Sequence, residues 1–112
     1  MKAVVAGGAG FIGSNLCDTL LARGDDVACL DNFVTGRPQN IEHLRKHPRF
    51  SFVEHDLTDG LPSIERPDAI FHLASPASPP GYQRHSIETL RVNSLGTEHL
   101  LKLAASTGAS FL

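Results

Sequence analysis

Lys2–Gly13, with the sequence KAVVAGGAGFIG, is the stretch that decides the fold of this 112-residue chain. It opens with a short, largely apolar run typical of a buried strand, and Gly8, Gly10 and Gly13 follow with Gly-x-Gly-x-x-Gly spacing. Glycines at 8 and 10 let the backbone turn tightly and come close to a diphosphate, and Gly13 lets the helix pack near the strand. The N–H groups at the start of the next helix favour the charge of such a group. The stretch therefore predicts a strand, a phosphate-binding turn and the start of a helix.

A second strand and an acidic residue follow at the distance that a dinucleotide site requires. Residues 14–23 continue as an amphipathic helix, and Val27–Leu30 is a second strand that ends at Asp31. A carboxylate at this place accepts hydrogen bonds from ribose hydroxyls and repels a 2′-phosphate, which favours NAD over NADP. A positive charge on Arg37 would favour NADP, but we expect Arg37 to be a surface or loop-anchoring residue. The alternative to a dinucleotide site is a tight turn in some other α/β protein.

The rest of the chain alternates apolar runs with helical patterns. We expect a short helix over 39–47, strands over 49–54 and 69–74, a proline-containing loop over 75–81, a long helix over 86–107, and a strand that begins at 109. The long helix is expected to turn its apolar residues toward the sheet, namely Ile87, Leu90, Leu100, Leu101 and Ala104. Right-handed crossovers then predict an α/β fold, a Rossmann-type doubly wound parallel sheet of order 3-2-1-4-5, truncated at the fifth strand.

Composition excludes several classes of function. The net charge is −2, so no polybasic surface indicates nucleic acid or an anionic membrane, and no apolar run approaches membrane-spanning length. Cys17 and Cys29 lack metal-type spacing, and we expect both to be reduced core residues of a cytoplasmic protein. His43 and His47 lack the glutamate of a His-Glu-x-x-His zinc site, so no metal site is expected.

The last apolar run, Ala109–Leu112, stops where a core strand would be starting. We therefore expect residues 1–112 to be the N-terminal part of an NAD-binding Rossmann domain. The catalytic and substrate-binding remainder would then be absent from this chain.

Four motifs at strand ends resemble those of one family. They are GGAGFIGS at 7–14, DNF at 31–33 with Thr35-Gly36, HDL at 55–57 and HLAS at 72–75. Together they resemble the extended short-chain dehydrogenases that act on nucleotide sugars, the NAD-dependent epimerases and dehydratases. The segment HLASPASPP at 72–80, with Tyr82, is similar to that of UDP-glucuronate decarboxylases. The resemblance covers essentially the whole chain.

The resemblance implies where the cofactor and the substrate bind. Cofactor contacts are implied for Gly7, Gly10, Phe11, Ile12, Gly13, Asp31, Asn32, Phe33, Thr35, Gly36, Asp56, Leu57, Leu73, Ala74 and Ser75. The glycine-turn residues would line the diphosphate, Asp31 would hold the adenosine ribose, Asp56 and Leu57 would flank the adenine, and Leu73–Ser75 would border the nicotinamide half. Tyr82 and Arg91 are candidate substrate contacts. We also expect Asn93 to bond to strand-end backbone and Gly96 to permit close packing of the long helix.

The implied activity is modification of a nucleotide sugar by oxidation at C4 with NAD. UDP-glucuronate decarboxylation, which forms UDP-xylose, fits best; a 4-epimerase, a 4,6-dehydratase or a non-catalytic NAD-binding regulator are the alternatives. Arg91-Val92 stands where the decarboxylases carry Lys-Thr, and Ala105-Ser106 stands where they carry Lys-Arg. These differences leave the identity of the nucleotide-sugar substrate undecided.

The family's catalytic base is the tyrosine of a Tyr-x-x-x-Lys motif, and the chain does not contain that motif. Its single tyrosine, Tyr82, is followed by Ser86 four residues later instead of by lysine. We therefore expect no catalytic residue in this chain, and the 112-residue piece alone is predicted to be inactive. The full-length protein is expected to form a homodimer, by analogy with the family.

Overall fold

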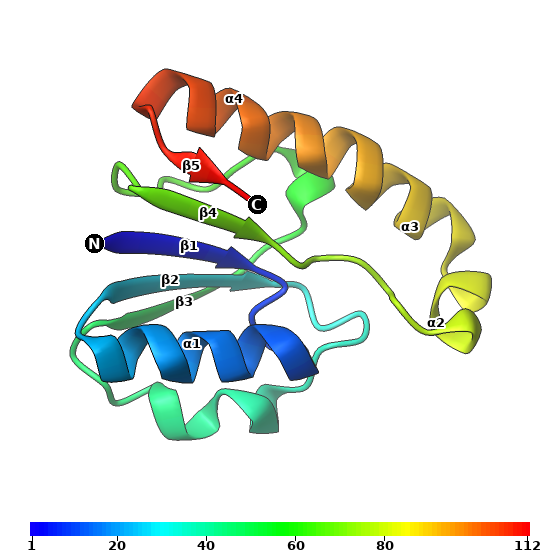
Figure 1. Ribbon diagram of the computed structural model, residues 1–112. Helices are drawn as coiled ribbons and strands as arrows, with labels where there is room; N and C mark the ends of the chain where they lie inside the picture. The colour runs from blue at the N-terminus through cyan, green and yellow to red at the C-terminus, as the bar shows by residue number, and fades with distance from the viewer.

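The computed structural model describes residues 1–112 as a five-stranded parallel sheet of order β3-β2-β1-β4-β5 (Figure 1). The strands are β1 (Lys2–Ala6), β2 (Asp26–Asp31), β3 (Phe50–Glu54), β4 (Ala69–His72) and β5 (Ser110–Phe111). The helices are α1 (Phe11–Arg23), α2 (Pro79–Arg84), α3 (Ser86–Arg91) and α4 (Thr97–Thr107). This order confirms the topology predicted from the sequence.

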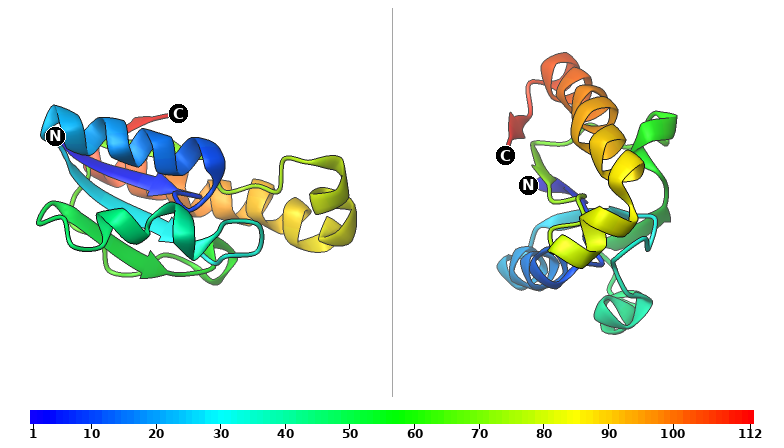
Figure 2. Two further views of the ribbon diagram at one scale, coloured as in Figure 1. Left: turned by 90° about the horizontal axis from the view of Figure 1, so that it is seen from below. Right: turned by 90° about the vertical axis from the view of Figure 1, so that its right-hand side faces the viewer.

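Helical segments lie on both faces of the sheet (Figure 2), and a separate apolar cluster fills the space on each face. On one face α1 packs with the residues that follow β2, where Cys17 and Ile41 are fully buried. On the other face α4 supplies Leu100 and Ala104. Neighbouring residues of β1, Val4 and Val5, are both almost completely buried because each points into a different layer. The central strand therefore carries the glycine turn on a rigid support.

Two expected elements differ from those observed. The segment 39–47, expected to be one helix, forms two short 3-10 turns, η1 (Pro38–Asn40) and η2 (Glu42–Leu44). The proline-containing loop was expected to extend to Gly81, but α2 begins within it at Pro79. Ser78 accepts a hydrogen bond from the Gly81 N–H and so caps this helix. Proline is compatible with the first turn of a helix because its missing N–H has no partner there.

The long helix expected over 86–107 is interrupted. A π turn at Val92–Gly96 separates α3 from α4, and the three segments follow one another without a break (Figure 1). Leu100 and Ala104 face the sheet as expected. The other three apolar residues were placed wrongly, since Ile87, Leu90 and Leu101 are 66%, 68% and 46% exposed. The outer face of α3 and α4 is therefore partly apolar.

None of the helices combines the length and the apolar character needed to cross a membrane. The carboxyl ends of β1, β2, β3 and β4 all point to the same edge of the sheet, and the pocket described below lies along that edge.

Candidate dinucleotide-binding site

The glycine turn after β1 is packed so closely that side chains are excluded at two places. Gly7 has φ +82°, and a Cβ on it would lie 2.5 Å from the carbonyl carbon and oxygen of Leu73. A Cβ on Gly13 would lie 2.2 Å from the carbonyl oxygen of Gly7. The turn thus touches both the first turn of α1 and the chain leaving β4. Glycine is required at both places by close backbone approach; the sequence pattern predicted this for Gly13 but not for Gly7.

The start of α1 offers hydrogen-bond donors without partners in the chain. Gly10 is the N-cap and has no side chain to bond the first turn, and α1 carries no acidic residue there. The first hydrogen bond of the helix is from the Ser14 N–H to the Gly10 carbonyl, at 2.9 Å. The N–H groups of Phe11, Ile12 and Gly13 are therefore free to bond an anion, with the helix dipole behind them.

Asp31 links the end of β2 to the glycine turn. One carboxylate oxygen accepts from the Ala9 N–H at 2.9 Å, and the other accepts from the Phe33 N–H at 2.8 Å. The residue is only 9% exposed, and a Cβ on Gly36 would lie 2.9 Å from both oxygens. The carboxylate is thus fixed in orientation, and it lines the pocket. A buried carboxylate with remaining lone pairs can accept from further hydroxyl groups.

A second acidic residue, Asp56, follows β3 and belongs to a local network. Burial on its own would raise the pKa of its carboxyl group. Hydrogen bonds from the Thr58 N–H and hydroxyl, with contributions from Asn32 and Arg91, outweigh burial and hold the pKa below its usual range. Asp56 is therefore a stable carboxylate at neutral pH. It lines the same pocket as Asp31, from the neighbouring strand.

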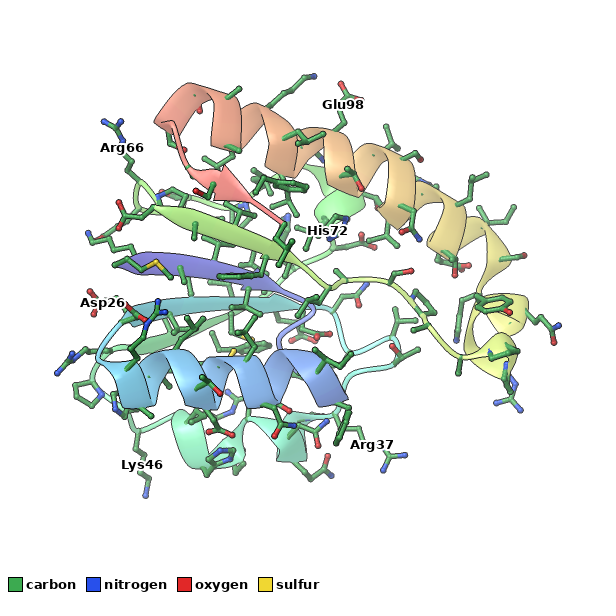
Figure 3. All side chains as sticks on the ribbon, in the orientation of Figure 1. Asp26, Arg37, Lys46, Arg66, His72 and Glu98 are labelled. Atoms are coloured by element: carbon green, nitrogen blue, oxygen red, sulfur yellow. The ribbon has the colours of Figure 1, made fainter.

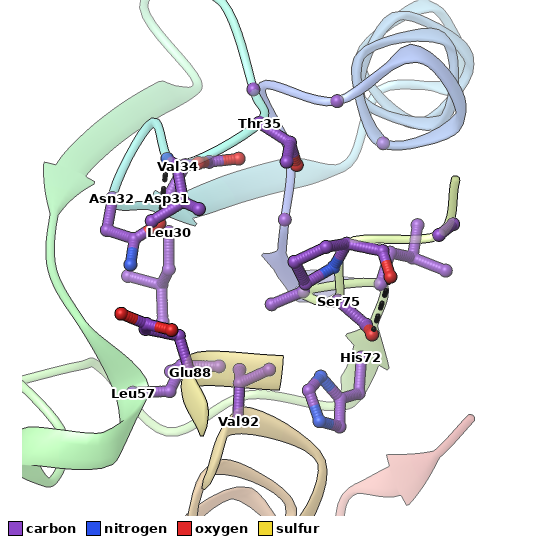
Figure 4. Close-up of a pocket in the computed structure, with 18 of the residues that line it drawn as sticks. Leu30, Asp31, Asn32, Val34, Thr35, Leu57, His72, Ser75, Glu88 and Val92 are labelled. Carbon is purple, nitrogen blue, oxygen red and sulfur yellow. Dashed lines mark hydrogen bonds between the residues drawn. The ribbon is translucent and has the colours of Figure 1, made fainter. Parts of the chain in front are cut away.

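These groups surround one pocket of about 640 Å³ at the carboxyl ends of the strands (Figure 4). Figure 4 shows Asp31 and Asn32 on one side of it and Ser75 and His72 on the other. Every predicted cofactor residue except Phe33 lines this pocket. The members are Gly7, Gly10, Phe11, Ile12, Gly13, Asp31, Asn32, Thr35, Gly36, Asp56, Leu57, Leu73, Ala74 and Ser75.

Three residues singled out in the sequence lie outside the pocket. Phe33 has φ +59° and its ring packs on Phe52, with 5.2 Å between the ring centroids, so only its main chain serves the site. Tyr82 lies on α2 and is 41% exposed. Arg37 anchors its loop through its N–H, which donates to the Ala9 carbonyl at 3.0 Å, and its side chain points away into solvent (Figure 3). Arg91 does line the pocket.

The pocket also contains residues that sequence reasoning missed. They are Leu30, Val34, His55, Thr58, His72, Pro76, Ala77, Ser78, Glu88 and Val92. Most of them adjoin a predicted residue in the chain. Glu88 and Val92 are different, because they come from α3 and the π turn and share a helix face with Arg91. The spacing 88, 91, 92 was the available signal for them.

His72, at the end of β4, is held as a neutral imidazole. The Thr97 hydroxyl donates to the Asn93 carbonyl at 2.9 Å, so it accepts from Nε2–H of His72 at 3.0 Å. Nδ1 is buried and has no partner. Burial lowers the pKa of His72 below its usual value of 6.5, and the nearby Val92 carbonyl only partly offsets this.

The lowered pKa makes stability depend on pH. Because the unfolded chain binds a proton at His72 more readily than the folded chain, this residue contributes stability that is complete well above pH 6.5 and is lost as the pH falls through that value. We expect the free energy of unfolding, measured by urea titration, to fall as the pH is lowered through 6.5. His72→Gln should make that fall shallower, whereas His85→Gln should not. Equal slopes for the two variants would contradict this assignment.

Known proteins are similar to this chain in sequence and in fold. The profile of the NAD dependent epimerase/dehydratase family matches residues 3–112. The chain belongs to the NAD dependent epimerase/dehydratase family. This confirms the resemblance stated from the four strand-end motifs, and it confirms NAD as the cofactor class.

Individual members of the family are similar over the whole chain. UDP-glucuronic acid decarboxylase 1 of Arabidopsis thaliana is 46% identical over 112 residues, which are 100% of this chain and 25% of that protein. UDP-glucose 4-epimerase of Thermotoga maritima, solved with UDP-glucose, has a TM-score of 0.83 and 32% identity, over 99% of this chain and 36% of that one. UDP-glucose 4-epimerase of Thermus thermophilus, solved with NAD, has a TM-score of 0.76 and 32% identity, over 97% of this chain and 35% of that one. The chain thus spans well under half the length of each.

Proposed function

We propose that the pocket at the carboxyl ends of the strands binds NAD. The observation that carries this proposal is the bond from the Ala9 N–H to the Asp31 carboxylate, because it joins the glycine turn and the acidic residue in one site. The diphosphate would lie on the free N–H groups of Phe11, Ile12 and Gly13. The adenosine ribose would lie on Asp31.

The remaining cofactor contacts are proposed from the lining of the pocket. Asp56 and Leu57 would flank the adenine, with Asn32, Thr35 and Gly36 around the ribose. Leu73, Ala74 and Ser75 would border the nicotinamide half. Phe33 would contribute its N–H to orient Asp31 and would not touch the cofactor itself. The fit is supported by the lining of the pocket, since Gly7, Gly10 and Gly13 have no side chain that could cover the start of α1.

The whole protein is proposed to be an NAD-dependent enzyme acting on a UDP-sugar. Bound NAD would supply the oxidation of a sugar hydroxyl, and residues 1–112 would form the N-terminal part of the NAD-binding domain. UDP-glucuronate decarboxylation is favoured because the decarboxylase relative is 46% identical. A 4-epimerase is the second candidate, since Arg91 and Val92 both line the pocket and depart from the decarboxylase pattern.

Two features support the proposed oligomeric state and location of the protein. Ile87, Leu90 and Leu101 leave apolar side chains exposed along α3 and α4, which supports a homodimer through these helices when the protein is full length. Cys17 and Cys29 are both free and buried, in agreement with the reducing cytoplasm proposed from the sequence.

Tyr82 would reach substrate only if α2 lies beside the sugar, whereas Arg91 already faces the pocket.

Isothermal titration calorimetry of the chain with NAD tests the cofactor proposal. We expect one molecule of NAD to bind per chain, and ADP to bind more weakly at the same site because it lacks the nicotinamide half. Nicotinamide mononucleotide alone should bind least, because it cannot reach Asp31. Absence of heat with both NAD and ADP, from a chain shown by circular dichroism to be folded, would overturn the proposal. A product assay with UDP-glucuronate should show no turnover by the 112-residue chain.

A further inference from the structure

The π turn lies where the long helix passes the end of β4. It occupies Val92–Gly96, and its wider backbone brings the Asn93 side chain to the chain that leaves β4. Turns of this kind are rare and cluster at functional sites. The sequence predicted that Asn93 bonds to strand-end backbone; the structure shows instead that it bonds to a strand-end side chain.

Asn93 is held in one orientation by two hydrogen bonds. Its amide nitrogen donates one hydrogen to the Ser75 hydroxyl at 2.8 Å and the other to the Thr89 carbonyl at 2.8 Å. Both hydrogens of the amide are thus used, which fixes its rotamer. The main chain of Asn93 is fixed as well, since its carbonyl accepts from the Thr97 hydroxyl at 2.9 Å.

Ser75 lies between the Asn93 amide and the glycine turn. Its N–H donates to the Leu73 carbonyl at 3.0 Å in a tight bend, and Gly7 packs against Leu73 and Ala74 from the other side. The Ser75 hydroxyl accepts from Asn93, while its own hydrogen faces only the Pro76 carbonyl at 3.5 Å, the limit of a hydrogen bond. Ser75 therefore presents a donor to the pocket, and Asn93 sets its direction.

We propose that Asn93 is a positioning residue for the nicotinamide-ribose half of the dinucleotide, and that it acts through Ser75. Asn93 does not line the pocket, whereas Ser75 does. The inference rests on the proposed NAD site. It assigns to the π turn the function of directing one hydroxyl at the end of β4, a role that a regular helix with its narrower turn would not provide at this position.

Calorimetry with two ligands tests the inference on the chain. Asn93→Ala should weaken NAD about 3–10-fold, the effect of one neutral hydrogen bond, and should change ADP less than about twofold. ADP is the probe because it carries the adenosine and diphosphate and lacks the nicotinamide half. Ser94→Ala is the matched control, since Ser94 lies in the same turn, is exposed and bonds only to helix carbonyls. It should change neither affinity.

A double-mutant cycle separates positioning from a general structural effect. Ser75→Ala alone should reproduce the loss for NAD, and adding Asn93→Ala to it should weaken NAD no further. Equal weakening of NAD and ADP by Asn93→Ala, or full additivity with Ser75→Ala, would overturn the inference. If Asn93→Ala does not fold, Ser75→Ala alone tests the inference, because an unchanged NAD affinity in that variant would also contradict it. Failure of the parent chain to bind either ligand would instead refute the NAD site itself.

Discussion

Replacing Gly7 with alanine is expected to abolish measurable NAD binding and to lower the free energy of unfolding by about 3–5 kcal/mol. Gly7 has φ +82°, which an alanine adopts only with strain, and the added Cβ would lie 2.5 Å from the Leu73 carbonyl group and 2.7 Å from the Ala74 nitrogen. Both neighbours are main-chain atoms, so no flexible side chain can move aside. Relief requires β1 and β4 to separate, and the proposed diphosphate and nicotinamide contacts separate with them.

Gly108→Ala is the control that removes the clash and keeps the strain. Gly108 has φ +76° at the end of α4, and nothing lies within 4 Å of a Cβ added there. Gly108→Ala should therefore lower the free energy of unfolding by only about 1–2 kcal/mol, the cost of a left-handed backbone for alanine. It should leave NAD affinity unchanged. Urea unfolding gives the stability of both variants and calorimetry gives the affinity. Similar losses of stability in the two variants would show that close packing at Gly7 does not matter.

The parts of the fold and of the pocket lining that could be predicted from the sequence depend on short-range rules. The spacing of Gly8, Gly10 and Gly13, with Asp31 at the end of the next apolar run, depends on backbone sterics and on parallel strands meeting at one edge. These constraints act within a short stretch of chain and need no knowledge of side-chain packing. For the same reason the strand order followed from the pattern, whereas most of the proposed cofactor residues came from the family resemblance; all of these except Phe33 line the pocket.

The long helix shows where such reasoning fails. A regular helix with Leu100 and Ala104 inward would also turn Leu90 toward the sheet, because at about 100° per residue it lies within about 60° of their mean direction. The π turn adds one residue to a turn, which rotates everything before it by about 100°. Ile87 and Leu90 are then exposed, and Glu88, Arg91 and Val92 face the pocket instead. The Asn93 bonds that accompany the turn reach Ser75, 18 positions away and beyond any local pattern.

Phe33 and α2 differ from expectation for another reason. The resemblance placed Phe33 beside the cofactor, and the prolines predicted a loop at α2, but neither takes account of local hydrogen bonds. Phe33 adopts φ +59°, uncommon for a bulky residue, and this directs its N–H to Asp31 and its ring to Phe52. Prolines at 79 and 80 suggested a loop, yet they occupy the first turn of a helix capped by Ser78. In both cases a hydrogen bond made by a neighbour decided the local conformation.

We expect the carboxylate of Asp31 to determine the preference for NAD over NADP, and Asp31→Asn is expected to change this preference strongly. We expect NAD affinity to fall about 10–100-fold, since charge-assisted hydrogen bonds to a ribose diol contribute about 1.5–3 kcal/mol. NADP affinity should rise or stay constant, because the charge that repels its 2′-phosphate is gone. The preference for NAD over NADP should therefore shrink by more than about tenfold.

Selectivity separates this effect from simple destabilisation. An asparagine keeps one acceptor oxygen for the N–H groups of Ala9 and Phe33, but its NH2 group then faces the other one, which lowers the free energy of unfolding by about 1–3 kcal/mol. If that loss unfolds part of the chain, it lowers the apparent affinity for both dinucleotides by the same factor and leaves their ratio unchanged. Asp59→Asn makes the same change in net charge at an exposed turn outside the pocket, so it should alter neither affinity. An unchanged ratio of NADP to NAD affinity in Asp31→Asn would mean that the adenosine ribose does not lie on this carboxylate, whatever binds at the glycine turn.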